Sequence, residues 1–347
     1  MPGAPVRIGV LSDYPADDGG AATETALRLG LDELGTRLDR DIELLSCPVA
    51  GLPYGSEHDV ARGFHELVDG GALVIVGPAI SDNGLIVTPL CDDVGIASVN
   101  YTGGERTRGH YGFHYQVGSL EEEPAVLATR LLARGLVRPA LVHDHSPVGR
   151  RYAEGFDEAA ASMGLDLTGR IAITPLAEDV TPALTRLRGG DPDSLVYLGL
   201  GVTSRPVALG LAELAWELPV MGNSALMFGY ARPEWRDGWA GWEYIDAIAD
   251  DNESRQALAG RDAATAAGPV GCALHDIGRL IGEALVRTEN LTRADLRDAL
   301  ERIKLLPATC GTEGTKMGFG NYDHAALTGT YLVLREWRGG KSVQVDA

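Results

Sequence analysis

The sequence predicts an α/β protein built from two lobes, each with a doubly wound parallel sheet. Short apolar runs alternate with segments of helical periodicity, which is typical of strand–helix–strand units. This alternation restarts near residue 119, so the pattern is present twice. The length of 347 residues also favours two domains, at about 150 residues per domain.

The first half of the chain contains four apolar runs that we expect to be strands, at residues 6–11, 42–46, 73–76 and 96–99. Leucines on a single helical stripe predict a helix over 22–38. Ser56 and Asp59 form a capping pair that predicts the start of a second helix. A third helix is expected near 83–93.

The second half repeats the pattern, with strands expected at 140–143, 171–173, 195–198 and 219–221. Helices are expected over 119–133, with Ser119 and Glu122 as its capping pair, over 149–163, from Thr181 onward, and over 204–216. Beyond residue 244, helices at 270–288 and 293–303 are expected to pack back onto the first lobe. Residues 331–337 and 342–345 predict a terminal hairpin.

One internal similarity indicates where a ligand would bind. Residues 74–81 read VIVGPAIS and residues 196–203 read VYLGLGVT, so each has a strand, a glycine, a short loop and a hydroxyl residue before a helix. In open parallel sheets ligands bind beyond the carboxyl ends of strands. Both loops are therefore expected to face a ligand in a cleft between the lobes, unless they are two unrelated strand–helix turns.

The charge of the chain disfavours nucleic acid as a partner. Lys and Arg total 30 against 49 Asp and Glu, a formal net charge of −19, and affinity for the phosphate backbone needs basic clusters. No apolar run reaches the roughly 18 residues that a membrane helix needs, so an embedded protein is not expected.

The N-terminus and the cysteines bear on the compartment. Because residues 6–11 already predict a buried strand and no leader-like segment precedes them, a cytoplasmic location is expected, or an extracytoplasmic one if a leader has been removed. Four widely spaced cysteines are compatible with two disulfides, but a chain of this size does not need them. We expect free, buried thiols.

Five stretches together resemble a known family. Residues 76–81 (VGPAIS), 95–102 (GIASVNYT), 141–144 (LVHD, with Gly149 following), 195–199 (LVYLG) and 219–222 (PVMG) occur in the order and spacing of the type I periplasmic binding proteins. The sequence is most similar to the branch of branched-chain amino acid and amide receptors, which resemble the leucine-binding protein. The resemblance covers nearly the whole chain.

This resemblance implies two lobes joined by three hinge crossings, near residues 116–119, 244–249 and 317–328. The first lobe would comprise residues 1–117 and 247–325, and the second lobe residues 118–246 and 326–347. In the family a ligand's carboxylate is held by hydroxyl groups and backbone amides of the first lobe, at positions that match Ser81, Asn100 and Thr102. Helix N-termini suit such an anion.

Loops of the second lobe would complete the site, at residues 147–149, 199–203 and 223–224. The ligand-contact residues expected from the sequence are Tyr14, Ser81, Asp82, Asn100, Tyr101, Thr102, Val148, Gly201, Val202, Asn223 and Ser224. Tyr14 and Tyr101 follow strands and would form an aromatic wall, or else seal the core. Phe228 and Trp242 are expected in the core.

Two departures from the family bear on the ligand. Receptors for α-amino acids commonly place a carboxylate where this chain has Asn223-Ser224, and an aromatic residue where it has Val148. An ammonium group buried without a partner is strongly penalised. We therefore expect a small amide, an aromatic acid or another neutral-to-acidic solute, and an amino-acid-like solute if Asp82, Asp144 or Glu243 supplies the charge.

An enzyme is disfavoured by the motifs. No metal site is expected at His143 and His145, and the pattern begun by Gly199 and Gly201 lacks the third glycine of a dinucleotide site. No cofactor or metal is therefore expected. The sequence favours the solute-binding protein of an ABC transporter, with a permease as partner. The alternative is a cytoplasmic ligand sensor read by a regulatory protein.

Overall fold

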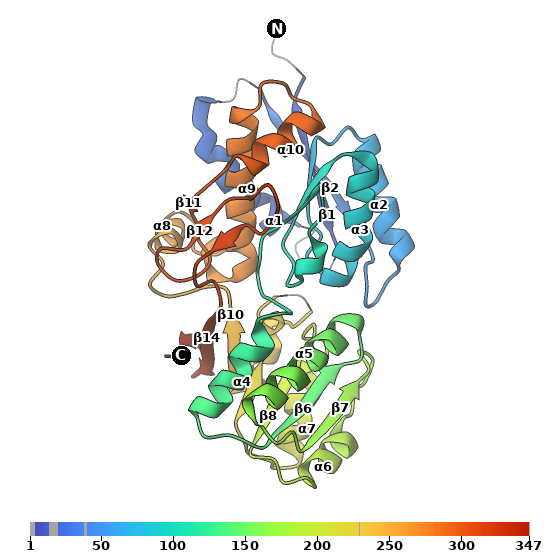
Figure 1. Ribbon diagram of the computed structural model, residues 1–347, viewed down its shortest axis with the longest axis vertical. Coiled ribbons are helices and arrows are strands. Elements are labelled where there is room, and N and C mark those ends of the chain that lie inside the picture. Colours follow the sequence, from blue (N-terminus) through green and yellow to red (C-terminus); the bar gives the residue numbers. More distant parts are fainter. Residues whose placement is uncertain (1–3, 14–19, 38–39, 229, 347) are drawn as a thin grey trace. The chain divides into compact units, whose positions relative to one another are not determined.

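The computed structural model describes residues 4–13, 20–37, 40–228 and 230–346. The chain divides into two compact units (Figure 1): unit 1 comprises Met1–Val117 and Ile248–Tyr331, and unit 2 comprises Gly118–Ala247 and Leu332–Ala347. The expected lobe boundary at 325 differs, because residues 326–331 lie in unit 1. Ala326 N donates to His114 O at 2.8 Å there, and Leu327 pairs with Met317.

Unit 1 contains a five-stranded sheet in the order β2-β1-β3-β4-β5, with all neighbours parallel. Its strands are β1 (Val6–Ser12), β2 (Ile42–Pro48), β3 (Val74–Val76), β4 (Ala97–Asn100) and β5 (Gly112–His114). A small antiparallel sheet joins β11 (Leu306–Pro307), β12 (Lys316–Met317) and β13 (Leu327–Thr328).

The helices of unit 1 cover both faces of the larger sheet (Figure 1): α2 (Glu57–Asp69) and α3 (Ser81–Val94) lie on one side, and α1 (Ala21–Leu31), α9 (Pro269–Arg287) and α10 (Arg293–Glu301) on the other. Helix α8 (Glu253–Arg261) precedes α9. Helices α1 and α9 cross closely at Gly30, where an added Cβ would lie 2.0 Å from His275 O. The helices after residue 248 thus belong to unit 1, as expected.

Unit 2 has a seven-stranded sheet in the order β15-β14-β10-β9-β8-β6-β7. Its strands are β6 (Pro139–Asp144), β7 (Gly169–Ile173), β8 (Ser194–Leu198), β9 (Val220–Gly222), β10 (Glu243–Asp246), β14 (Val333–Arg338) and β15 (Lys341–Gln344). The strands from β6 to β10 are parallel, and the predicted terminal hairpin adds β14 antiparallel to β10 and β15 antiparallel to β14.

The helices of unit 2 form two pairs, α4 (Glu123–Ala133) with α5 (Pro147–Met163) and α6 (Thr181–Arg188) with α7 (Ser204–Glu213). Helix α5 is capped by Ser146, whose hydroxyl accepts a bond from Gly149 N at 3.0 Å. The core between α6, α7 and the sheet contains Trp239 and Trp242. Short 3-10 turns lie at Asp32–Arg37, Glu105–Thr107, Ser224–Leu226, Pro233–Trp239 and Thr265–Ala267.

Several helix boundaries differ from the sequence expectation. Helix α4 begins at Glu123 rather than at 119, because the Ser119 hydroxyl accepts a bond from Glu122 N at 3.0 Å in a turn that precedes the helix. The helix expected over 22–38 ends at Leu31 and continues as a 3-10 turn that Gly35 interrupts with φ 54°. The Ser56 cap of α2 is confirmed, with Asp59 N donating at 3.1 Å.

Candidate functional site

Five strands of each sheet share one order, and this order predicts where a ligand would bind in each unit. The order 2-1-3-4-5 appears as β2-β1-β3-β4-β5 in unit 1 and as β7-β6-β8-β9-β10 in unit 2. In such sheets the order reverses between the first and third strands, and ligands bind beyond their carboxyl ends. The reversal lies between β1 and β3 in unit 1 and between β6 and β8 in unit 2.

The expected contact residues lie at these carboxyl ends. Ser81 and Asp82 open α3 after β3, Asn100 ends β4 and precedes Tyr101 and Thr102, and Val148 lies in the first turn of α5. Gly201 and Val202 lie between β8 and α7, and Asn223 and Ser224 follow β9. Tyr14 lies outside the described residues. Their contact with a ligand stays a prediction.

A buried aspartate holds the first loop in place. Asp13, directly after β1, is 1% exposed. Its carboxylate accepts bonds from Ala79 N at 2.8 Å, Ile80 N at 2.9 Å and Asn83 Nδ2 at 2.8 Å. Burial raises the pKa of Asp13, and these three donors oppose the shift. Asp13 therefore ties the end of β1 to the loop that presents Ser81.

A second buried aspartate performs the same task in unit 2. Asp144 ends β6, and its carboxylate accepts bonds from Leu200 N at 2.7 Å, from the Tyr197 hydroxyl at 2.9 Å and from the Thr203 hydroxyl. Burial raises its pKa to about 6. Gly199 makes this approach possible, because a Cβ there would lie 2.4 Å from the Asp144 carboxylate. The sequence similarity between the two loops thus extends to an aspartate that holds each of them.

Glu123 is a third buried carboxylate, and it holds Ser224. It accepts bonds from Ser224 N at 2.8 Å, the Ser224 hydroxyl at 2.7 Å, Ser119 N at 2.6 Å and the Tyr152 hydroxyl at 3.1 Å. Burial raises its pKa to about 7, against these bonds. Glu123 thereby fixes the turn after β9 to the segment with which unit 2 begins.

Asn100 and Thr102 belong to a closed turn in unit 1. The Asn100 carboxamide oxygen accepts bonds from the hydroxyls of Thr102 and Thr107, each at 3.2 Å, and these two hydroxyls lie 3.0 Å apart. The Thr102 carbonyl bonds His114 Nε2 at 2.8 Å, and burial lowers the pKa of His114 to about 3. The side chains of Asn100 and Thr102 are both buried, so they stabilise the turn that contains Tyr101.

Two further expectations concern aromatic and histidine side chains. Tyr101 is 2% exposed, and Phe228 and Trp242 are buried, as expected for the latter two. His143 is buried and bonds the Asp144 carbonyl at 3.1 Å, whereas His145 is exposed. Within the described ranges no three His, Cys, Asp or Glu side chains come together as metal ligands.

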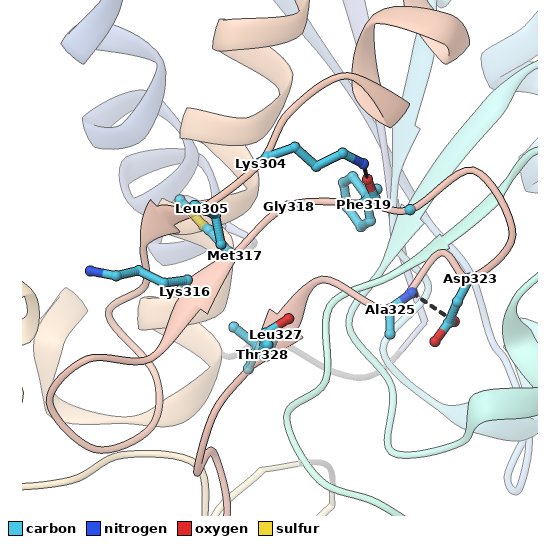
Figure 2. A pocket seen from close by; sticks show the side chains of 11 residues that line it. Lys304, Leu305, Lys316, Met317, Gly318, Phe319, Asp323, Ala325, Leu327 and Thr328 are labelled. Atoms are coloured by element: carbon cyan, nitrogen blue, oxygen red, sulfur yellow. Dashed lines mark hydrogen bonds between the residues drawn. The ribbon is translucent and has the colours of Figure 1, made fainter.

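Unit 1 also contains a hollow of about 290 Å³ away from these loops (Figure 2). Met317, Phe319 and Leu327 contribute apolar surface to it, and Lys304 and Lys316 lie at its edges. The Lys304 ammonium donates to the carbonyl groups of Glu301, at 2.7 Å, and Phe319. Through these two bonds Lys304 joins the end of α10 to the segment after β12. The lining of the hollow contains none of the expected contact residues.

The fold has many solved relatives. A leucine-binding protein from Thermotoga maritima is 13% identical, with a TM-score of 0.81 over 98% of each chain. A type 1 periplasmic binding protein from Bordetella pertussis is 15% identical, with a TM-score of 0.83 over 99% of this chain and 100% of that one. A branched-chain amino acid transporter substrate-binding protein from Streptococcus pneumoniae, in complex with isoleucine, is 14% identical, with a TM-score of 0.80 over 99% and 100%.

No curated protein matches the chain. Among the described residues, no helix combines the length and the apolar character needed to cross a membrane. The family described as periplasmic binding protein matches residues 5–341. The chain therefore belongs to the periplasmic binding protein family, with the type I fold.

Proposed function

We propose that this protein is the solute-binding component of an ABC transporter, and that it binds a small organic acid or amide without an ammonium group. The observation that carries the proposal is the matched pair of loops held by Asp13 and Asp144 at the two points of strand reversal. A solute that contacts the loops of both units stabilises the closed arrangement by the difference between its affinities for the closed and the open form. A permease would bind the closed form.

The proposed ligand class is supported by three carboxylates of unit 2 that already have partners. Glu123 receives four hydrogen bonds from protein donors and Asp144 receives three. Glu243 is paired with Arg130 at 2.7 Å and Arg134 at 2.8 Å. A buried ammonium group needs a carboxylate or an equivalent partner. Asp82, the third carboxylate considered from the sequence, is buried at 4% exposure, and its role is tested by substitution.

Ligands that share a carbon skeleton test this class directly. Thermal unfolding is measured with 4-methylpentanoate, 4-methylpentanamide and leucine, and with 3-phenylpropanoate, its amide and phenylalanine. A ligand at about 100 times its Kd adds roughly 2.7 kcal/mol to the free energy of unfolding. We expect an acid or an amide to raise Tm more than the matching amino acid does. Stabilisation by the amino acid alone, lost in Asp82→Asn, would show that the ligand class is wrong.

A further inference from the structure

Two of the four cysteines are neighbours in the core of unit 1. Cys272 lies in the first turns of α9, Cys310 follows β11, and both are 0% exposed. The Cys310 thiol lies 4.0 Å from Pro269 O, and Pro269 precedes Cys272 by one helical turn. The Cys272 thiol and burial raise the pKa of Cys310 well above its usual value, in agreement with these contacts.

The segment before Cys310 is pinned to the same part of α9. The Thr309 hydroxyl donates to Cys272 O at 3.1 Å, and Thr309 N donates to the Asp276 carboxylate at 2.6 Å. These two contacts lie one turn apart on the helix, so residues 309 and 310 run along its surface. The approach of the two thiols is therefore set by backbone contacts as well as by the thiols themselves.

The other two cysteines lie in different surroundings. The Cys47 thiol, in β2, donates to the Glu66 carboxylate at 3.3 Å. Cys91, in α3, is 0% exposed, and burial raises its pKa, with Asp92 as the next cause. Neither pKa is affected by a second cysteine, so both residues serve as internal controls.

We propose that Cys272 and Cys310 form a disulfide when the chain folds in an oxidising environment, and that this bond ties residues 308–311 to α9. A low-molecular-weight disulfide is the oxidant. One cysteine, as its thiolate, attacks this disulfide, which forms a mixed disulfide and releases one small thiol. The second cysteine then attacks the mixed disulfide, and the protein disulfide forms as the other small thiol leaves. The two thiol protons end on the two released thiols.

The disulfide would lie beside the point at which the chain passes from unit 2 back to unit 1. Gly311 forms a strand bridge with Ile248, the first residue of unit 1 after the chain returns from unit 2. Asn252 also binds this segment, donating to Ala308 O at 3.1 Å and to Gly311 O at 2.9 Å. Oxidation would therefore fix the segment that receives the chain at this crossing.

Refolding tests the proposal. The reduced protein, unfolded in guanidinium, is refolded either with oxidised and reduced glutathione or with dithiothreitol, and thiols are counted after a second unfolding. We expect two thiols after the glutathione refolding and four after dithiothreitol, with peptide mapping that links Cys272 to Cys310. Closing the loop from Cys272 to Cys310 should also raise Tm by roughly 8 to 16 °C.

The control variants separate this pair from other pairings. Cys47→Ser and Cys91→Ser should each leave one thiol in the oxidised protein and keep the same linked peptides. Cys272→Ser should retain three thiols under both conditions. Four thiols in the wild-type protein after refolding with glutathione, or linked peptides that contain Cys47 or Cys91, would overturn the proposal. The peptide map of the wild-type protein decides the question even if Cys272→Ser does not fold.

Discussion

The two loop-holding aspartates should respond differently to replacement by asparagine. Among the described residues, three nitrogen groups donate to Asp13, namely Ala79 N, Ile80 N and Asn83 Nδ2, and none of them can accept a hydrogen bond. The amide group of an asparagine at 13 must therefore face one of these donors. Asp144 receives one nitrogen donor, Leu200 N, and two hydroxyls. An asparagine at 144 can accept from Leu200 N and donate to both hydroxyls.

The expected difference between the variants follows from these partners. Asp13→Asn loses one hydrogen bond to a charged group, about 1.5–3 kcal/mol, and leaves a buried donor without an acceptor, about 1–3 kcal/mol. Asp13 and Asp144 are equally buried, at 1% and 0% exposure. Removing the charge therefore relieves a similar desolvation cost in both variants, and this gain largely cancels when their stabilities are compared. Because these two costs describe the same lost contact and overlap in part, we expect Asp13→Asn to be less stable than Asp144→Asn by about 2–4 kcal/mol.

Calorimetry of both variants measures this difference. At about 2–4 °C per kcal/mol for units of this size, Tm of Asp13→Asn should lie roughly 4–16 °C below that of Asp144→Asn. Asp166→Asn is the matched control, because its carboxylate is exposed and lies 3.5 Å from Arg138, a pair worth about 0–1 kcal/mol. Equal Tm values for the Asp13 and Asp144 variants would refute the reasoning.

Three further predictions concern single residues. The pKa of Glu123 in the folded protein, about 7, lies above its ordinary value of 4.5, so the contribution of Glu123 to stability falls as pH rises from about 4.5 to 7. The difference in Tm between the wild type and Glu123→Gln should therefore fall over this range, and a constant difference would contradict this prediction. Ser81→Ala should weaken solute binding, measured by titration calorimetry, by about 1–3 kcal/mol without changing the unfolding of the free protein, and unchanged affinity would remove Ser81 from the site. Gly30→Ala should lower Tm sharply because the added Cβ would meet His275 O. Gly260→Ala should raise Tm slightly because Gly260, in α8, has open space around it. Equal Tm shifts for the two variants would contradict the close crossing of α1 and α9.

The sequence predicted the alternation of strands and helices because apolar periodicity is a local signal. It placed the strands β1, β2, β3 and β4 and their counterparts in unit 2 within a few residues, and with them the loops at their carboxyl ends. It missed β5 (Gly112–His114), which has only three residues and no clear periodicity. Helix starts were less certain because a hydroxyl such as that of Ser119 can cap a turn as well as a helix.

The carboxylates that organise the loops were mostly missed. Asp13 reaches residues 66 to 70 positions away, and Glu123 reaches Ser224, 101 positions away. Contacts of this range depend on the strand order, which periodicity does not give. One signal was present, since each half places an aspartate at or just after the end of its first strand, as Asp13 and Asp144.

The division of unit 1 into two chain segments has a consequence for biosynthesis. Helix α9, whose contact with α1 requires Gly30, is translated only after the whole of Gly118–Ala247. The parallel strands β6 to β10 come from one uninterrupted stretch, so this part of unit 2 can fold while the nascent chain still lacks the partner of α1. The segment made first thus acquires this packing partner only after that part of unit 2 has been made, and until then the face of α1 that packs against α9 stays uncovered.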